Sequence, residues 1–133
     1  MATLEQRFVL TPGEARDAYL VQLLLATREA DPKTSAIVFC RTCRTTELVG
    51  QLMAKVGVPA SVLHSMRPQK ERTATLALFK SGQTRVLVAT DVASRGLDIP
   101  EVNMVVNHSV PRDPVVSRLF SLALNDALMN RYS

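Results

Sequence analysis

Short apolar runs alternate along this chain with longer segments whose apolar residues recur at helical spacing. The apolar runs at residues 36–40, 60–63, 85–89 and 101–107 predict buried strands. The segments between them predict helices, the first from a start signal at residues 11–14 to about Glu29, and the others over residues 42–57 and 68–82. Strands that read as continuous apolar runs and alternate with helices are typical of a parallel sheet covered on both faces, so the predicted fold class is α/β.

The predicted topology also indicates where a ligand would bind. In open α/β sheets the ligand site lies outside the carboxyl ends of the strands. Three polar or charged segments fall there, at residues 40–44, 64–72 and 90–99. These segments are the least needed for packing, so we expect the functional side chains among them.

The distribution of charge favours two of these segments, at residues 40–44 and 64–72, as the place where a ligand binds. The 133 residues carry 16 bases and 12 acids, a net charge of +4. Residues 41–72 hold six bases and two acids, which alone account for that excess. Clustered bases favour nucleic acid or a nucleotide as a partner, and an ordinary solvated basic face is the alternative.

Composition excludes several other classes of protein. The 47% of hydrophobic residues is enough for a core in one domain. The longest apolar stretch, over residues 20–26, is broken by Gln22, and no secretory signal is visible, so we expect an intracellular protein without a membrane span. Two cysteines cannot form a disulfide framework, which favours a reducing compartment.

The loop at residues 89–100, ATDVASRGLDIP, holds a hydroxyl, two carboxylates, an arginine and a glycine. An ionised Asp98 can accept a hydrogen bond from a ribose hydroxyl, and Thr90 with its neighbouring backbone N–H can bind a phosphate. The alternative is a local role, in which an aspartate caps a short helix and Arg95 pairs with a nearby acid.

This loop resembles motif V of DEAD-box RNA helicases, in their second, RecA-like domain. Further resemblances follow in the family's order: IVFCRT at residues 37–42 to motif IV, LHSMRPQKER at residues 63–72 to the QxxR motif, and VVNHSVPRDP at residues 105–114 to the segment before motif VI. Four motifs in order are far more specific than any one of them. The resemblance implies a three-layer RecA-like domain, and residues 17–20 and 63–66 are most similar to a nucleolar ribosome-biogenesis subgroup.

The resemblance also implies roles for individual residues and partners for the chain. The positions that it assigns to the RNA sugar-phosphate backbone and its surroundings are Thr42, Gln69, Arg72, Thr90 and Asp91. Those that it assigns to ATP, held against the family's first RecA-like domain, are Arg95, Gly96 and Asp98. RNA, ATP with Mg²⁺ and that first domain are therefore the expected partners, in a nuclear, nucleolar or cytoplasmic location.

Two departures from the family pattern qualify this expectation. The sequence holds neither a GxxxxGK[ST] phosphate loop nor a DEAD tetrapeptide, which in the family belong to the first domain along with the metal-binding carboxylates. The HRxGRxxR of motif VI is also missing, since VVSRLF stands at residues 115–120. We therefore expect no catalytic residue and no ATP hydrolysis in this chain alone, and divide it into a helicase domain at residues 1–114 and a divergent helical tail at residues 115–133.

Four other interpretations stay open at this point. The apolar face of the tail predicts either a core helix or a surface for self-association. The chain can also act as a non-catalytic RNA-binding or docking module, or belong to a DNA helicase of the same superfamily. Cys40 and Cys43 form a C-x-x-C pattern that permits thiol-disulfide chemistry, and His64 and His108 are too isolated to favour zinc over packing or surface roles.

Overall fold

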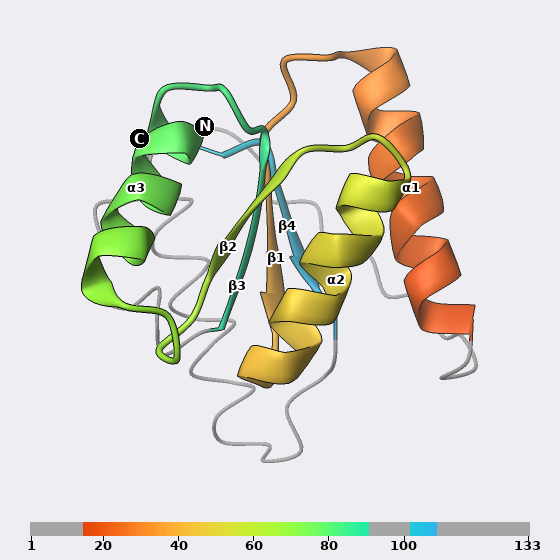
Figure 1. The fold of residues 1–133 in the computed structure, drawn as a ribbon. Coiled ribbons are helices and arrows are strands. Elements are labelled where there is room, and N and C mark those ends of the chain that lie inside the picture. The colour runs from red at the N-terminus through yellow and green to blue at the C-terminus, as the bar shows by residue number, and fades with distance from the viewer. Residues whose placement is uncertain (1–14, 91–101, 109–133) are drawn as a thin grey trace, which may run out of the picture. The chain divides into compact units, whose positions relative to one another are not determined.

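The computed structural model describes residues 15–90 and 102–108 of the chain. The elements in chain order are α1 (Arg16–Ala30), β1 (Ala36–Cys40), α2 (Cys43–Lys55), β2 (Ala60–Leu63), α3 (Gln69–Lys80), β3 (Val86–Thr90) and β4 (Met104–Asn107). Strands and helices alternate, which confirms the predicted α/β class. Figure 1 shows the strands as a central layer, with α1 and α2 on one side and α3 on the other.

The four strands form one parallel sheet in the order β2-β3-β1-β4. β3 is the central partner of both β1 and β2, and its five residues are all buried. The register pairs Ala36 with Val86 at the start of β1 and Cys40 with Thr90 at its end. Because the strands are parallel and in step, their carboxyl ends meet at a single edge of the sheet.

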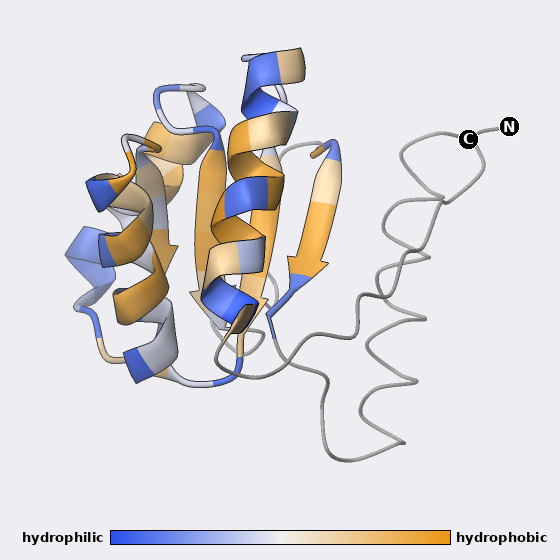
Figure 2. Cartoon of the chain, turned by 90° about the vertical axis from the view of Figure 1, so that its right-hand side faces the viewer, coloured by the Kyte–Doolittle hydropathy of each residue, from blue (hydrophilic) through white to orange (hydrophobic). Residues whose placement is uncertain are grey.

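Side chains of successive residues alternate between the two faces of the sheet, as a strand requires. In β1, Ala36, Val38 and Cys40 face α1 and α2, whereas Ile37 belongs to the cluster around Phe79 of α3. The neighbouring β3 follows the same alternation, with Val86 and Val88 on the first face and Leu87 and Ala89 on the second. Figure 2 shows these strands as the most hydrophobic part of the structure.

The helices end as the sequence predicts. Gly57 follows α2 and Gly82 follows α3, and each adopts a φ of +80°, a left-handed conformation that costs glycine no steric penalty. A third glycine serves packing instead. A Cβ placed on Gly50 in α2 would lie 2.3 Å from Cγ2 of Val62, so α2 approaches β2 closely only because this side chain is absent.

The predicted elements match the observed ones to within three residues, except at the beginning of α1. The start signal at residues 11–14 lies outside the described residues, as do the tail at residues 115–133 and most of the motif V loop. Among the described helices, none has the length and apolar character needed to cross a membrane.

Candidate nucleic-acid interface

The amino-terminal ends of the described helices lie at the carboxyl edge of the sheet, and those of α2 and α3 adjoin the predicted RNA contacts. α2 begins just after β1, and α3 begins after the turn that follows β2, so both start at the lower end of the sheet in Figure 1. The first N–H groups of a helix lack partners within the helix and carry a partial positive charge, which favours anions such as phosphate. This edge is therefore the candidate site, and the sequence predictions for Thr42, Gln69, Arg72 and Thr90 all fall on it.

Thr42 is exposed and caps α2. Its Oγ1 accepts a hydrogen bond from the backbone N–H of Thr45 at 3.1 Å and donates one to Oγ1 of Thr45 at 2.9 Å. The Thr42 carbonyl accepts a further bond of 2.7 Å from the hydroxyl of Thr46. A contact from the Thr42 hydroxyl to a phosphate would therefore have to replace its bond to the Thr45 hydroxyl.

Gln69 and Arg72 lie on the first turn of α3 and contact each other. Nη2 of Arg72 donates to Oε1 of Gln69 at 2.6 Å, which fixes the guanidinium beside the amide. Nε of Arg72 is shielded from solvent and has no hydrogen-bond acceptor among the described residues. A guanidinium is suited to bind an oxyanion through the N–H groups of its Nη atoms, whereas the shielded Nε could reach one only if the side chain moved.

Thr90 is the last residue of β3 and lies beside Cys40 at the same edge. Its accessible surface is only 5% of the maximum, so the residue reaches the edge without being open to solvent there. The position agrees with the sequence prediction, and contact of Thr90 with RNA stays a prediction.

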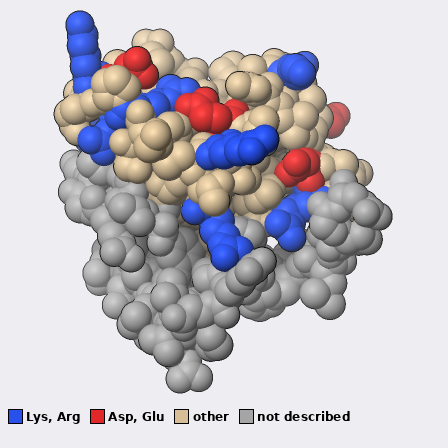
Figure 3. All heavy atoms as spheres, turned by 60° about the horizontal axis from the view of Figure 1, so that its bottom comes forward, with Lys and Arg blue, Asp and Glu red and all other residues tan. Residues whose placement is uncertain are grey.

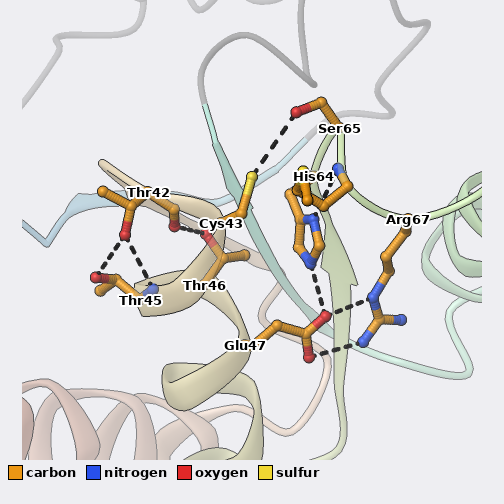
Figure 4. Close-up of polar contacts among 9 residues, drawn as sticks. Thr42, Cys43, Thr45, Thr46, Glu47, His64, Ser65 and Arg67 are labelled. Carbon is orange, nitrogen blue, oxygen red and sulfur yellow. Dashed lines mark hydrogen bonds and ion pairs between the residues drawn. The ribbon is translucent and has the colours of Figure 1, made fainter.

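A cluster of three side chains that the sequence analysis did not single out lies next to these residues (Figure 4). Glu47 on α2 reaches the turn between β2 and α3, where its Oε1 accepts bonds of 2.6 Å from Nε2 of His64 and 2.7 Å from Nε of Arg67. Its Oε2 accepts a bond of 3.0 Å from Nη2 of Arg67. The Arg67 and His64 hydrogen bonds lower the pKa of Glu47 from 4.5 to about 2, and the same carboxylate raises the pKa of Arg67.

His64 joins the turn to this carboxylate through both nitrogens of its ring. Nδ1 accepts a bond of 3.2 Å from the backbone N–H of Met66, so Nε2 carries the proton that is donated to Glu47. The residue is buried, with 4% of its surface exposed. His64 is thus a packed residue, as one of the two expected roles has it, and its ring also makes specific hydrogen bonds.

The cluster also changes the interpretation of the basic segment. Arg67 is one of the six bases at residues 41–72, yet its charge is neutralised by a two-point contact with Glu47. Figure 3, which brings the lower end of Figure 1 forward, shows basic and acidic side chains mixed over the described surface. The count of six bases therefore overstates how many cations are available to a ligand, although the net charge of the segment, which already includes Glu47, stays the same.

The three expected ATP contacts, Arg95, Gly96 and Asp98, lie outside the described residues, as does Asp91. Their roles stay predictions. Across residues 15–90 and 102–108, no group of three or more histidine, cysteine or acidic side chains is arranged to hold a metal ion.

The environment of Cys40 disfavours thiol-disulfide chemistry. Cys40 ends β1 with 3% of its surface exposed, and burial raises the pKa of its thiol to about 11. A reactive C-x-x-C motif needs the opposite shift, because the thiolate is the nucleophile. Cys43 lies 3.7 Å from the hydroxyl of Ser65, sulfur to oxygen, and packs at the start of α2.

The second histidine tethers the end of the sheet to the first helix. Nε2 of His108, just after β4, lies 2.7 Å from Oδ1 of Asp17 on α1, and the His108 backbone N–H donates to the carbonyl of Phe39 at 2.9 Å. These two bonds link the end of β4 to α1 and to β1.

Comparison with known proteins identifies the family. The model of the helicase conserved C-terminal domain matches residues 15–126, and the chain therefore belongs to this family. Its sequence and fold are those of the second RecA-like domain of a DEAD-box helicase, as the motifs predict.

Relatives with known names include the human probable ATP-dependent RNA helicase DDX49, which is 47% identical over 113 residues, or 85% of this chain and 23% of that protein. The ATP-dependent RNA helicase DBP8 of Saccharomyces cerevisiae is 44% identical over 115 residues, or 86% of this chain and 26% of that protein. The chain thus spans about a quarter of the length of these relatives.

Solved structures support the same fold. The RNA helicase Prp28 from Chaetomium thermophilum, bound to ADP, matches with a TM-score of 0.71 and 34% identity over 86% of this chain and 28% of that one. Dbp5 from S. cerevisiae, bound to RNA and ADP BeF3, matches with a TM-score of 0.66 and 29% identity over 77% of this chain and 25% of that one.

Proposed function

We propose that this domain binds single-stranded RNA through the sugar-phosphate backbone, along the carboxyl edge of its sheet. The observation that carries the proposal is the convergence of three predicted contacts on that edge: Thr42 at the start of α2, Arg72 in the first turn of α3, and Thr90 at the end of β3. The two helix starts supply N–H groups with partial positive charge, and the guanidinium of Arg72 supplies a full charge.

Such a site would recognise RNA without reading its sequence. Hydroxyl, guanidinium and backbone N–H groups complement phosphate and ribose oxygens, which are the same at every nucleotide. The proposed contacts, Thr42, Gln69, Arg72 and Thr90, include no aromatic side chain that would favour particular bases by stacking. The similar structure of Dbp5 with RNA and ADP BeF3 supports a ligand of this kind.

We further propose that the domain works as the second half of an ATP-dependent RNA helicase. Asp98, Gly96 and Arg95 would complete an ATP site with a first RecA-like domain that supplies the phosphate loop and the Mg²⁺ ligands. Binding energy from ATP and RNA would then favour closure of the two domains. A role in ribosome biogenesis, a nucleolar or cytoplasmic location and self-association through the tail stay predictions.

Arg72→Ala tests the RNA site. We expect the full chain carrying this change to bind fluorescein-labelled oligouridylate and oligoadenylate about tenfold more weakly, because a charge-assisted hydrogen bond is lost. The slope of log affinity against log salt should fall by about 0.7, the value for one phosphate contact on a single strand. Fluorescence anisotropy over a series of salt concentrations measures both quantities.

Arg28→Ala is the matched control, because it removes the same charge from an exposed position in the last turn of α1, which lies by the starts of β1, β3 and β4 at the other end of the sheet. It should leave the affinity within about twofold of the wild type, since a distant charge is largely screened. Equal weakening by the two variants, or a loss confined to one oligonucleotide sequence, would contradict backbone recognition at this edge.

A further inference from the structure

The two ends of α3 are held in different ways. Phe79, in the last turn, is the only buried residue of the helix, with 4% of its surface exposed. At the other end, the capping position is Pro68 and no side chain caps the free N–H groups. Packing of Phe79 therefore holds the last turn of α3. The first turn, which carries Gln69 and Arg72, needs a restraint from another part of the structure.

The turn before α3 contains little that would hold it by packing. Leu63, the last residue of β2, is buried, but Ser65, Met66 and Pro68 are all exposed, Met66 by 78%. Within the turn, the backbone N–H of Arg67 donates to the carbonyl of His64 at a long 3.3 Å. The contact of Ser65 with Cys43 involves sulfur and is weak.

Glu47 supplies the missing restraint from another element. Its carboxylate receives three hydrogen bonds of 2.6–3.0 Å, one from His64 at the beginning of the turn and two from Arg67 near its end. Two of them come in parallel from the planar guanidinium, an arrangement that fixes direction as well as distance. α2 itself is fixed to the sheet by four buried residues, so the carboxylate has a rigid support.

We propose that Glu47 is a positioning residue for RNA binding: by holding His64 and Arg67, it sets the turn at residues 64–68 and with it the orientation of Gln69 and Arg72. This inference rests on the proposed function, because it assigns a purpose to the turn that delivers the RNA contacts. The same inference makes Arg67 a structural partner of Glu47. We therefore do not expect Arg67 to contact RNA.

Glu47→Gln in the full chain tests the proposal. The amide keeps the size of the side chain but offers only one acceptor oxygen, and its NH₂ group would face the donors of Arg67 and His64. We expect the amides of Arg67 and of residues 72–75, the first hydrogen-bonded amides of α3, to exchange with solvent about tenfold faster, with unchanged exchange in β1 and β3, because only a local restraint is lost. Hydrogen exchange followed by NMR measures each amide.

RNA affinity gives the functional readout. Glu47→Gln should weaken binding of fluorescein-labelled oligouridylate about fivefold, and adding it to Arg72→Ala should weaken binding no further, because coupled residues are non-additive. Additive effects of the two changes would overturn the positioning role, as would unchanged exchange at Arg67 and residues 72–75. If the wild-type chain fails to bind RNA, the proposed function falls while the exchange result still decides whether Glu47 orders the turn.

Two further variants keep the test decisive. Glu29→Gln removes the same charge from an exposed position on α1 and should change neither exchange nor affinity. Arg67→Gln leaves Glu47 bonded to His64 alone, and should raise the exchange of the same amides by a smaller factor than Glu47→Gln. If Glu47→Gln does not fold, the Arg67→Gln result carries the decision, and unchanged exchange in that variant would overturn the proposal.

Discussion

α2 and α3 start at the same edge of the sheet but are secured by opposite means. α2 has four buried residues, Thr46, Val49, Gly50 and Met53, and a hydroxyl cap from Thr42, the residue directly before it. α3 has one buried residue and no side-chain cap, and the turn before it depends on a carboxylate that belongs to α2. α2 is thus held by its own cap and buried residues, and it supports the turn before α3. The predicted RNA contacts on α3 therefore depend on a tertiary interaction.

The largest effect should come from removing the single anchor of α3. Phe79→Ala is expected to lower the free energy of unfolding by about 3–5 kcal/mol, because a buried aromatic ring is replaced by a cavity. Phe79→Leu should cost less than about 1.5 kcal/mol, since most of the volume is kept. Urea unfolding followed by circular dichroism measures both, and a loss below about 1 kcal/mol for the alanine variant would show that α3 has another anchor.

A smaller loss is expected when the cap of α2 is removed. Thr42→Ala should cost about 1 kcal/mol, because the N–H of Thr45 loses its acceptor, whereas Thr42→Ser keeps the hydroxyl and should cost a few tenths at most. The same urea experiment separates the two. If the serine variant were as unstable as the alanine variant, the methyl group of Thr42 and not its cap would stabilise the start of α2.

The smallest effect is a dependence of stability on pH that involves Glu47. Its pKa falls from 4.5 to about 2 in the folded state, so the ionised carboxylate stabilises the fold fully above pH 4.5 and loses this effect as the pH falls through about 2. Side-chain exposure of 36% limits the gain to less than about 1 kcal/mol. Urea midpoints at pH 5.5 and pH 3 should therefore differ less in Glu47→Gln than in the wild type.

Glu29→Gln serves as the control for this measurement as well, and should keep the pH dependence of the wild type. A Glu47→Gln variant with the full wild-type dependence would mean that other carboxylates account for the loss of stability in acid. In that case the ion pair of Glu47 with Arg67 would not contribute measurably to stability, and α2 and α3 would differ only in their buried residues.

Much of the fold was predictable because its signals are local. The apolar runs at residues 36–40 and 60–63 became β1 and β2 with the same bounds, and Gly57 and Gly82 end their helices at the predicted places. The motifs also placed Thr42, Gln69, Arg72 and Thr90 at the carboxyl edge, where the structure has them. Asp91, Arg95, Gly96 and Asp98 lie beyond the described residues, and their roles remain predictions.

The contacts of Glu47 could not be found in the same way. Glu47 is one polar residue on an amphipathic helix, and nothing within its own segment distinguishes it from a solvated side chain. His64 and Arg67 are 17 and 20 residues further along the chain, and the bonds exist only because β2 brings the turn beside α2. A histidine directly after a strand and an arginine three residues later are only a weak signal that the turn is bonded to a carboxylate on another helix.

The sequence by itself determined the class of fold, the family and the edge of the sheet that carries the candidate site, because apolar periodicity, caps and motifs act over a few residues. Only the tertiary structure decided which charges are free and which are neutralised, because hydrogen bonds between Glu47, His64 and Arg67 depend on how two separate helices pack on one sheet. That arrangement turns one of the six bases from a candidate RNA ligand into a structural partner.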